Sequence, residues 1–261
     1  MKRLILSFIL INYFFSVFAQ SEAQKFKDKQ LDDSSLYMID LKVNLIKCDF
    51  SPLFTQTDNS VVYGFIGDNY QRIRIKFISV KKDLVLPYTY SVYGKSMVKN
   101  NICDFRGTFT ILNIRRYKKM TYGVDDEFKN KGIKGRFVIL GNYSLFENKD
   151  KNYPGAFKGV FKTAFYMDKN DRACYDDINM ATDGYTNNQF VGQWAAFNSN
   201  MAKRYNWGDY RVPDSPGLDI GAGEFSPADK YLKYGWQSIR DRMISQNGKN
   251  AQQAEEAKWW Q

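Results

Sequence analysis

A short unit with a central glycine recurs four times in the chain and restricts the folds that it can adopt. The four copies are Phe105-Arg-Gly-Thr-Phe109, Ile133-Lys-Gly-Arg-Phe137, Phe157-Lys-Gly-Val-Phe161 and Phe190-Val-Gly-Gln-Trp194. Residues two apart share one face of a strand, so each glycine lies between two large apolar side chains. Glycine in that position marks a bend or a close approach of another strand. Unless the repeat arises by chance, it predicts a mainly β fold with a curled antiparallel meander, either a small barrel or a sandwich, lipocalin-like in outline.

Alternation of apolar and polar residues locates the strands of this meander. Over 71–77, Ile73, Ile75 and Phe77 share one face, while the cations Arg72, Arg74 and Lys76 share the other. The cationic row is expected to be a solvated surface, with contact to an acidic glycan or a phosphate surface as the alternative. Further strands are expected over 36–47, 61–66, 88–92, 104–114, 134–146, 156–167 and 189–197. Residues 36–198 are therefore expected to form the antiparallel β body.

Residues 199–261 have a different character, with an aromatic, loop-rich stretch followed by a helix that is expected to pack on the β body. Ser226 is the expected N-cap, Pro227 the first helical residue, and Asp229 completes a capping box. From there, apolar residues follow at helical spacing: Leu232, Trp236, Ile239 and Met243.

The start of the chain has the pattern of a secretory signal peptide. Lys2 and Arg3 precede an apolar run that ends at Phe18-Ala19, which predicts removal of residues 1–19. Residues 20–35 are polar and are expected to be a flexible leader. The expected location is the periplasm or the exterior, without stable membrane insertion. Removal lowers the formal charge from +10 to +8, and export argues against a nucleic acid partner.

Cysteine and histidine usage limits the chemistry. Cys48, Cys103 and Cys174 allow one disulfide in an oxidising compartment, and the sequence does not decide which pair forms. The chain contains no histidine, which removes serine–histidine–acid triads, cysteine–histidine dyads and histidine metal sites. The sequence therefore favours a non-enzymatic protein without a cofactor, although carboxylate chemistry, serine–lysine chemistry and oxygen-ligand metals stay open.

Aromatic and acidic residues in the second half of the chain are the candidate ligand-binding set. They are Trp194, Trp207, Tyr210, Arg211, Asp219, Glu224 and Trp236. Aromatic rings beside acids and amides suit stacking on sugar rings, so a glycan or an envelope protein is the expected partner. The alternatives are a glycoside hydrolase that uses Asp219 and Glu224, and a structural or assembly component without a small ligand.

A cluster of acids around 168–177 resembles part of a calcium loop. Asp168, Asp171, Asp176 and Asp177 offer the oxygen ligands that a hard cation prefers. The cluster lacks the glycine and the terminal glutamate of an EF-hand, and a hairpin turn with a few acids explains it equally well. We therefore predict no metal site.

Several sequence segments of the chain resemble those of a family of exported bacterial proteins with no established activity. They are Asn69-Tyr-Gln-Arg-Ile-Arg-Ile-Lys-Phe77, Gly94-Lys-Ser-Met-Val-Lys-Asn-Asn-Ile102, Asn187-Asn-Gln-Phe-Val-Gly-Gln-Trp194 and Asp219-Ile-Gly-Ala-Gly-Glu-Phe-Ser-Pro227. The resemblance implies export and a shared architecture, and it transfers no functional residue.

Overall fold

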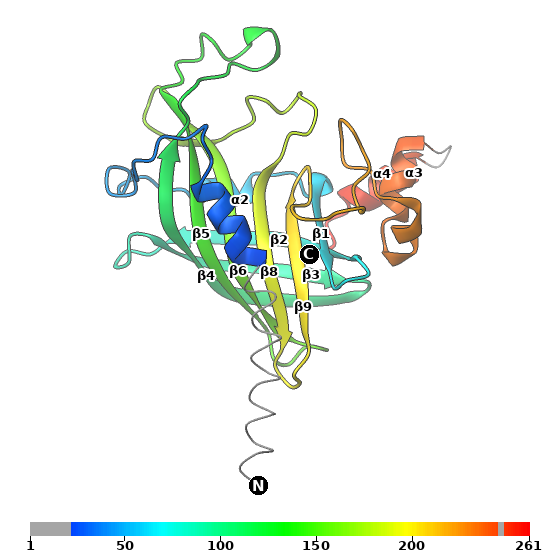
Figure 1. Cartoon of the computed structure of the whole chain (residues 1–261). Coiled ribbons are helices and arrows are strands. Elements are labelled where there is room, and N and C mark those ends of the chain that lie inside the picture. The colour runs from blue at the N-terminus through cyan, green and yellow to red at the C-terminus, as the bar shows by residue number, and fades with distance from the viewer. Residues whose placement is uncertain (1–21, 245–247) are drawn as a thin grey trace.

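Eight antiparallel strands close into a barrel in the computed structural model, which describes residues 22–244 and 248–261 (Figure 1). The barrel strands are β1 (Val62–Ile66), β2 (Gln71–Lys82), β3 (Thr89–Val98), β4 (Asn101–Arg116), β5 (Gly135–Glu147), β6 (Gly155–Met167), β8 (Asn187–Ala196) and β9 (Ala202–Asp209). Pairing of β5 with β6 completes the ring, and the short β7 (Ala173–Tyr175) pairs with β6 outside it. The predicted curled meander is thus confirmed as a barrel. The predicted signal peptide, 1–19, lies outside the described residues.

The strands differ from the sequence prediction in three places, one of which is the short β7, which was not predicted. The strand expected over 36–47 is wrong, because this segment contributes only a bridge from Leu36 to Tyr117 and then forms turns. Conversely, β9 lies in a region where the sequence indicated mainly loops. It pairs with both β1 and β8, and its Tyr205 and Trp207 point into the core.

Three of the four recurring glycines, Gly107, Gly159 and Gly192, lie directly against the backbone of a neighbouring strand. A Cβ atom on Gly107 would lie 1.9 Å from the Ser144 carbonyl oxygen, and one on Gly159 would lie 2.2 Å from the Val191 oxygen. Gly159 and Gly192 are direct partners across β6 and β8. The fourth glycine, Gly135, is the first residue of β5. Small residues therefore allow the sheet to curl tightly where two strands meet.

Aromatic side chains fill the middle of the barrel. Phe190 stacks on Trp207 with 4.1 Å between ring centroids, and Phe109 packs against Phe161 at 5.0 Å. At one end, the short helix α2 (Pro52–Thr55) inserts Leu53 and Phe54 into this core. We call this end the closed end. The barrel is therefore solid at its centre, and any interior site must lie towards the other end.

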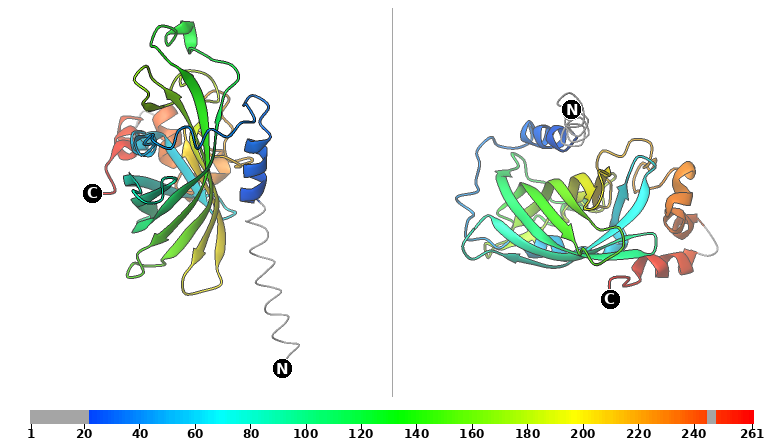
Figure 2. Two further views of the ribbon diagram at one scale, coloured as in Figure 1. Left: turned by 90° about the vertical axis from the view of Figure 1, so that its left-hand side faces the viewer. Right: turned by 90° about the horizontal axis from the view of Figure 1, so that it is seen from below.

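Residues 22–31 are helical and pack on the outside of the barrel, opposite to the expectation of a flexible leader. Ala23 and Phe26 are buried against Leu140, Val160 and Val191, which are outward-facing residues of β5, β6 and β8. The leader alone has too few apolar residues to order itself, but the sheet supplies the missing apolar surface. This helix and the C-terminal helices lie on different sides of the barrel (Figure 2).

A C-terminal helix is present, but it is broken into parts. A 3₁₀ turn, η3 (Asp229–Tyr234), follows Ala228, so Ser226 is not the N-cap. Gly235 has φ of +97° and ends this turn, after which α3 (Gln237–Ile244) and α4 (Gly248–Glu256) follow. Trp236 and Ile239 are buried against outward-facing residues of β1, as the helical spacing predicted. Two further 3₁₀ turns are η1 (Asn59–Val61) and η2 (Val124–Asp126).

The cationic row of β2 is covered, which corrects the expectation of a solvated face. Arg72 and Arg74 contact Glu255 of α4. The Lys76 ammonium lies 4.9 Å from the ring centroid of Trp260. The outer face of β2 therefore holds the C-terminal segment. In the described part of the chain, every helix is too short or too polar to cross a membrane.

Candidate functional site

A cavity of about 1050 Å³ occupies the end of the barrel opposite α2. We call it the mouth cavity. Four hairpin turns surround it, between β1 and β2, β3 and β4, β5 and β6, and β8 and β9. Its lining includes apolar residues from the strand ends, namely Ile66, Ile73, Val98, Phe157, Trp194 and Ala202. The aromatic core forms the inner end of this cavity, because Phe157 belongs to both.

A buried carboxylate lies in the wall of the mouth cavity. Glu147 accepts hydrogen bonds from the Ser96 hydroxyl (2.5 Å), the Trp194 indole Nε1 (2.9 Å) and the backbone N–H of Gly155 (2.9 Å). Burial raises the pKa of this carboxyl group, although the three donors oppose the change. The hydrogen bond from Nε1 fixes the orientation of the Trp194 ring. Because the Glu147 oxygens already accept three hydrogen bonds, the carboxylate is engaged within the protein.

Cations line the outer part of the mouth cavity. Lys99 belongs to the turn between β3 and β4, and Lys203 lies on β9 with its ammonium 5.9 Å from the Trp194 ring centroid. Arg204 also lines the cavity, but it is held by Glu22 at 2.6 Å. Lys99 and Lys203 have no ion pair with any residue of 22–244 or 248–261. The arrangement suits a molecule with an apolar body and an anionic or strongly polar end.

Of the three tryptophans in the predicted set, only Trp194 lines the mouth cavity. Trp207 is part of the aromatic core, 3% exposed. Trp236 is fully buried outside the barrel, where its Nε1 donates to the Tyr70 carbonyl at 2.8 Å. The aromatic density that predicted a ligand-binding set thus reflects core packing for Trp207 and Trp236.

The other predicted residues lie on the outside of the barrel. Arg211 pairs with Asp219 at 2.5 Å and donates to the carbonyl oxygens of Gly221 (2.8 Å) and Gly223 (2.6 Å). Tyr210 packs on the ring of Tyr185, and Glu224 is exposed.

Asp219 also accepts the backbone N–H groups of Gly221 and Ser226, so its carboxylate organises a loop. Neither Asp219 nor Glu224 lines the mouth cavity, the side pocket or the closed-end cluster described below. This placement gives no support to the alternative, a glycoside hydrolase that uses the two acids.

Sequence reasoning missed Glu147 and Ser96. Both are inward positions of alternating strands, and Glu147 follows Tyr143 and Leu145 on the inward face of β5. A single acid at an inward position is a usable signal, because a buried carboxylate needs donors. The sequence does not show that Ser96 donates to Glu147, because Ser96 lies 51 residues away on β3.

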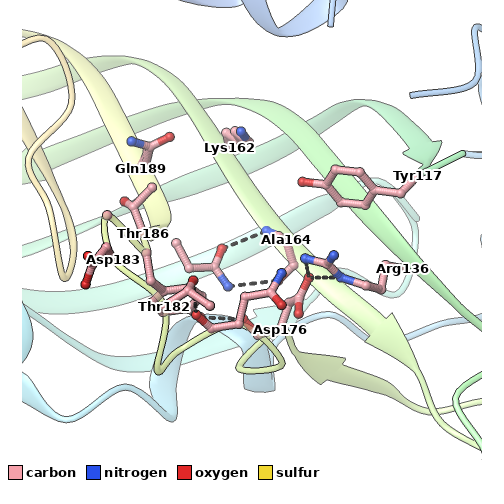
Figure 3. Close-up of a pocket in the computed structure, with 13 residues that line it drawn as sticks. Tyr117, Arg136, Lys162, Ala164, Asp176, Thr182, Asp183, Thr186 and Gln189 are labelled. Atoms are coloured by element: carbon pink, nitrogen blue, oxygen red, sulfur yellow. Dashed lines mark hydrogen bonds and ion pairs between the residues drawn. The ribbon is translucent and has the colours of Figure 1, made fainter. Parts of the chain in front are cut away.

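A second, smaller pocket of about 280 Å³ lies between the outside of the barrel and the chain that leads into β8 (Figure 3). We call it the side pocket. Its polar groups are largely hydrogen-bonded to one another. Arg136 forms an ion pair with Asp176 at 2.8 Å. The Asn187 side-chain amide accepts the backbone N–H of Ala164 and donates to the Ala164 carbonyl oxygen. Burial lowers the pKa of Lys162 in its wall. Because its charges are mostly matched internally, this pocket is a weaker candidate than the mouth cavity.

The closed end contains a buried acid, Asp209, in what we call the closed-end cluster. Its carboxylate accepts hydrogen bonds from Thr57 (2.7 Å), Tyr175 (2.9 Å) and Asn188 (2.7 Å). Burial raises its pKa to about 7 in spite of these donors. The residues come from four separate segments, so the cluster ties α2 and β7 to the barrel end.

The acids that resembled a calcium loop have local partners. Asp168 accepts the backbone N–H groups of Asn170 and Arg172 and thereby forms the turn before β7. Asp171 pairs with Lys134 at 2.6 Å. In the ranges 22–244 and 248–261, the acids, cysteines and histidines form no group of three that could hold a metal ion.

The three cysteines are unpaired in the structure. Cys103 is buried, and this burial raises the pKa of its thiol to about 11. Cys48 and Cys174 are half-buried.

No family model, no curated protein and no solved structure matches this chain. The assignment of a function therefore depends on the geometry of the site. The resemblance to a family of exported bacterial proteins stays a prediction from the sequence.

Proposed function

We propose that this protein is a non-enzymatic exported barrel that binds a small amphipathic molecule in its mouth cavity. The observation that carries the proposal is a cavity of about 1050 Å³ with apolar strand residues inside and unpaired lysines near its outer end. Ligand pockets in proteins commonly have volumes of about 300–1000 Å³ and are mainly apolar with a few polar groups. The signal-peptide pattern of residues 1–19 supports action in the periplasm or outside the cell.

The wall chemistry favours a ligand whose apolar part enters first. Ile73, Val98 and Phe157 offer carbon surface, and the indole of Trp194 is fixed by Glu147. Burial of apolar surface contributes about 25 cal/mol per Å², and an anionic end group would lie near Lys99 and Lys203. A glycan is the second candidate, since Trp194 offers a ring face and Asn101 and Gln193 offer amides beside it.

Thermal-shift measurements on the exported, purified protein test this function. The panel comprises fatty acids of increasing chain length, a lysophospholipid, neutral alkyl glucosides and soluble oligosaccharides. A ligand that binds only the folded state raises the melting temperature. We expect the fatty acids to raise it, with a larger effect for longer chains. A rise with oligosaccharides alone would replace the amphipathic ligand by a glycan.

Two variants locate the binding. Val98→Trp fills the mouth cavity and is expected to abolish the ligand-induced shift, whereas Ile220→Ser changes an exposed residue outside the barrel and should leave it intact. Absence of any shift across the panel, in a protein that melts cooperatively, would overturn the proposal. N-terminal sequencing of the exported protein tests removal of residues 1–19, which should leave Gln20 first.

A further inference from the structure

The turn between β2 and β3 exposes three consecutive aliphatic side chains at the closed end of the barrel. Leu84 is 101% exposed, Val85 84% and Leu86 58%. We call these three residues the apolar tip. Removing aliphatic side chains from water is favourable, so the exposure of these three residues leaves free energy available for binding.

The backbone of the apolar tip is held in place. The Asp83 carboxylate accepts the N–H groups of Val85 (2.8 Å) and Leu86 (2.9 Å), and the N–H of Thr89 donates to the Leu86 carbonyl oxygen at 2.8 Å. An ordered turn presents its side chains without the entropic cost of first fixing the backbone. The exposed side chains of Leu84, Val85 and Leu86 are thus presented on a preformed support.

A neighbouring loop adds to this surface. Lys82 donates to the carbonyl oxygens of Ile46 and Cys48, the latter at 2.8 Å, and thereby joins the loop to the end of β2. On the same loop, Val43 is 70% exposed and Ile46 37%. The tip and the loop both project from the left-hand side of the barrel in Figure 1. Several aliphatic side chains are therefore gathered at this corner of the molecule.

The charges around the tip favour an anionic surface. Lys47 and Lys81 are exposed and form no ion pair within the described ranges. The nearby acids Asp40, Asp49 and Asp83 each accept a backbone N–H group of an adjacent turn. The three acids keep their charge, but the four lysines of this corner, Lys42, Lys47, Lys81 and Lys82, outnumber them, which leaves a net charge of +1. Lys47 and Lys81 are therefore able to contact an external anion.

We propose that the apolar tip is a peripheral docking site for a lipid bilayer that contains anionic lipids. The aliphatic side chains of the tip would insert among the acyl chains of the bilayer, and the lysines next to the tip would contact the anionic headgroups. A protein partner would have to supply a preformed pocket for the same shape. The docking site lies at the opposite end of the barrel from the mouth cavity, so it does not depend on the proposed ligand.

Vesicle co-sedimentation tests the docking site with two kinds of vesicle, phosphatidylcholine alone and phosphatidylcholine mixed with phosphatidylglycerol. We expect the protein to sediment with the mixed vesicles and to be released by raised salt, because lysine contacts to lipid phosphates are screened. The double variant Leu84→Ser/Leu86→Ser should lose at least tenfold in partition. Lys81→Glu should weaken the binding to mixed vesicles only.

Ile220→Ser is the matched control, since Ile220 is 62% exposed but lies on a loop far along the chain. It should bind as the unaltered protein does. Equal binding of the double variant, or no sedimentation with either vesicle, would overturn the proposal. Analytical ultracentrifugation tests whether a second copy of the chain binds the tip instead. If the protein self-associates and the double variant does not, the tip is a dimer contact and the lipid proposal is rejected.

Discussion

The guanidinium of Arg72 on β2 and the carboxylate of Glu255 on α4 form a bidentate ion pair that is almost completely buried. Nη1 lies 2.8 Å from Oε1, Nη2 bonds Oε2, and the two side chains are 7% and 2% exposed. The pair joins residues 183 positions apart. It therefore fastens the last helix of the chain to the outside of the barrel.

Glu255→Gln is expected to lower the free energy of unfolding by about 3 kcal/mol, because it leaves the buried Arg72 without its counter-charge. Urea denaturation measures the change. Glu256→Gln is the matched control, since Glu256 is the exposed neighbour on the same helix. Similar losses for the two variants would contradict the role assigned to the ion pair.

The same pair predicts a loss of stability in acid. Burial alone would raise the pKa of Glu255, but the hydrogen bond and charge of Arg72 outweigh it and lower this pKa to about 2. An unfolded glutamate titrates near about 4.3. The stabilisation by Glu255 is therefore complete above about pH 4.3 and lost as the pH falls towards about 2. The difference in unfolding free energy between the unaltered protein and Glu255→Gln should shrink over this window, and a constant difference would argue against it.

Asp209 predicts the opposite dependence on pH. Burial raises its pKa to about 7 in the folded protein, whereas an unfolded aspartate titrates near about 3.9. The folded state therefore retains a proton that the unfolded state releases, so stability falls from about pH 4 to about pH 7 and is then constant, by about 4 kcal/mol in all. Asp209→Asn should remove this decline from curves of unfolding free energy against pH. Parallel curves for the two proteins would contradict the raised pKa.

Gly192→Ala is expected to be strongly destabilising. The new Cβ would lie 2.2 Å from the Lys158 carbonyl oxygen on β6 and 2.4 Å from the Tyr143 hydroxyl. Overpacking of this kind typically costs about 1–3 kcal/mol, and the backbone contact leaves little room to relax, so we expect the upper end of that range. Ala195→Ser, at an exposed position of the same strand, controls for substitution on β8. Equal urea midpoints would show that the two strands can separate without cost.

Glu147→Gln should disturb the wall of the mouth cavity. The new amide group would face one of the three donors that the carboxylate now accepts, and an unsatisfied buried donor costs about 1–3 kcal/mol. We expect a lower melting temperature and a shift in tryptophan emission, because the hydrogen bond from the Trp194 Nε1 to the Glu147 carboxylate is weakened or lost. Glu127→Gln changes an exposed glutamate and serves as the control. An unchanged emission spectrum would indicate that Trp194 is held by packing alone.

Much of the fold could be predicted because strand signals are local. Over β2, Ile73, Ile75 and Phe77 alternate with cations, and this pattern places the core face correctly. β9 was missed because Asn206 and Gly208 interrupt the apolar pattern, although its pairing with β1 and β8 closes the barrel. The C-terminal helix was predicted as continuous, but Gly235 adopts a left-handed conformation that the helical spacing of Leu232, Trp236 and Ile239 does not reveal.

The sequence by itself determined the class of fold, because the two-residue period of a strand and the glycines between large residues depend only on near neighbours. It also excluded histidine-dependent chemistry. Only the tertiary structure decided which distant segments meet: Ser96 with Glu147, Arg72 with Glu255, and residues 22–31 with the outside of the barrel. A periodic pattern shows that a face is apolar or charged, but the partner that covers it is set by long-range packing. For that reason the mouth cavity and the true role of the cationic row were visible only in the folded chain.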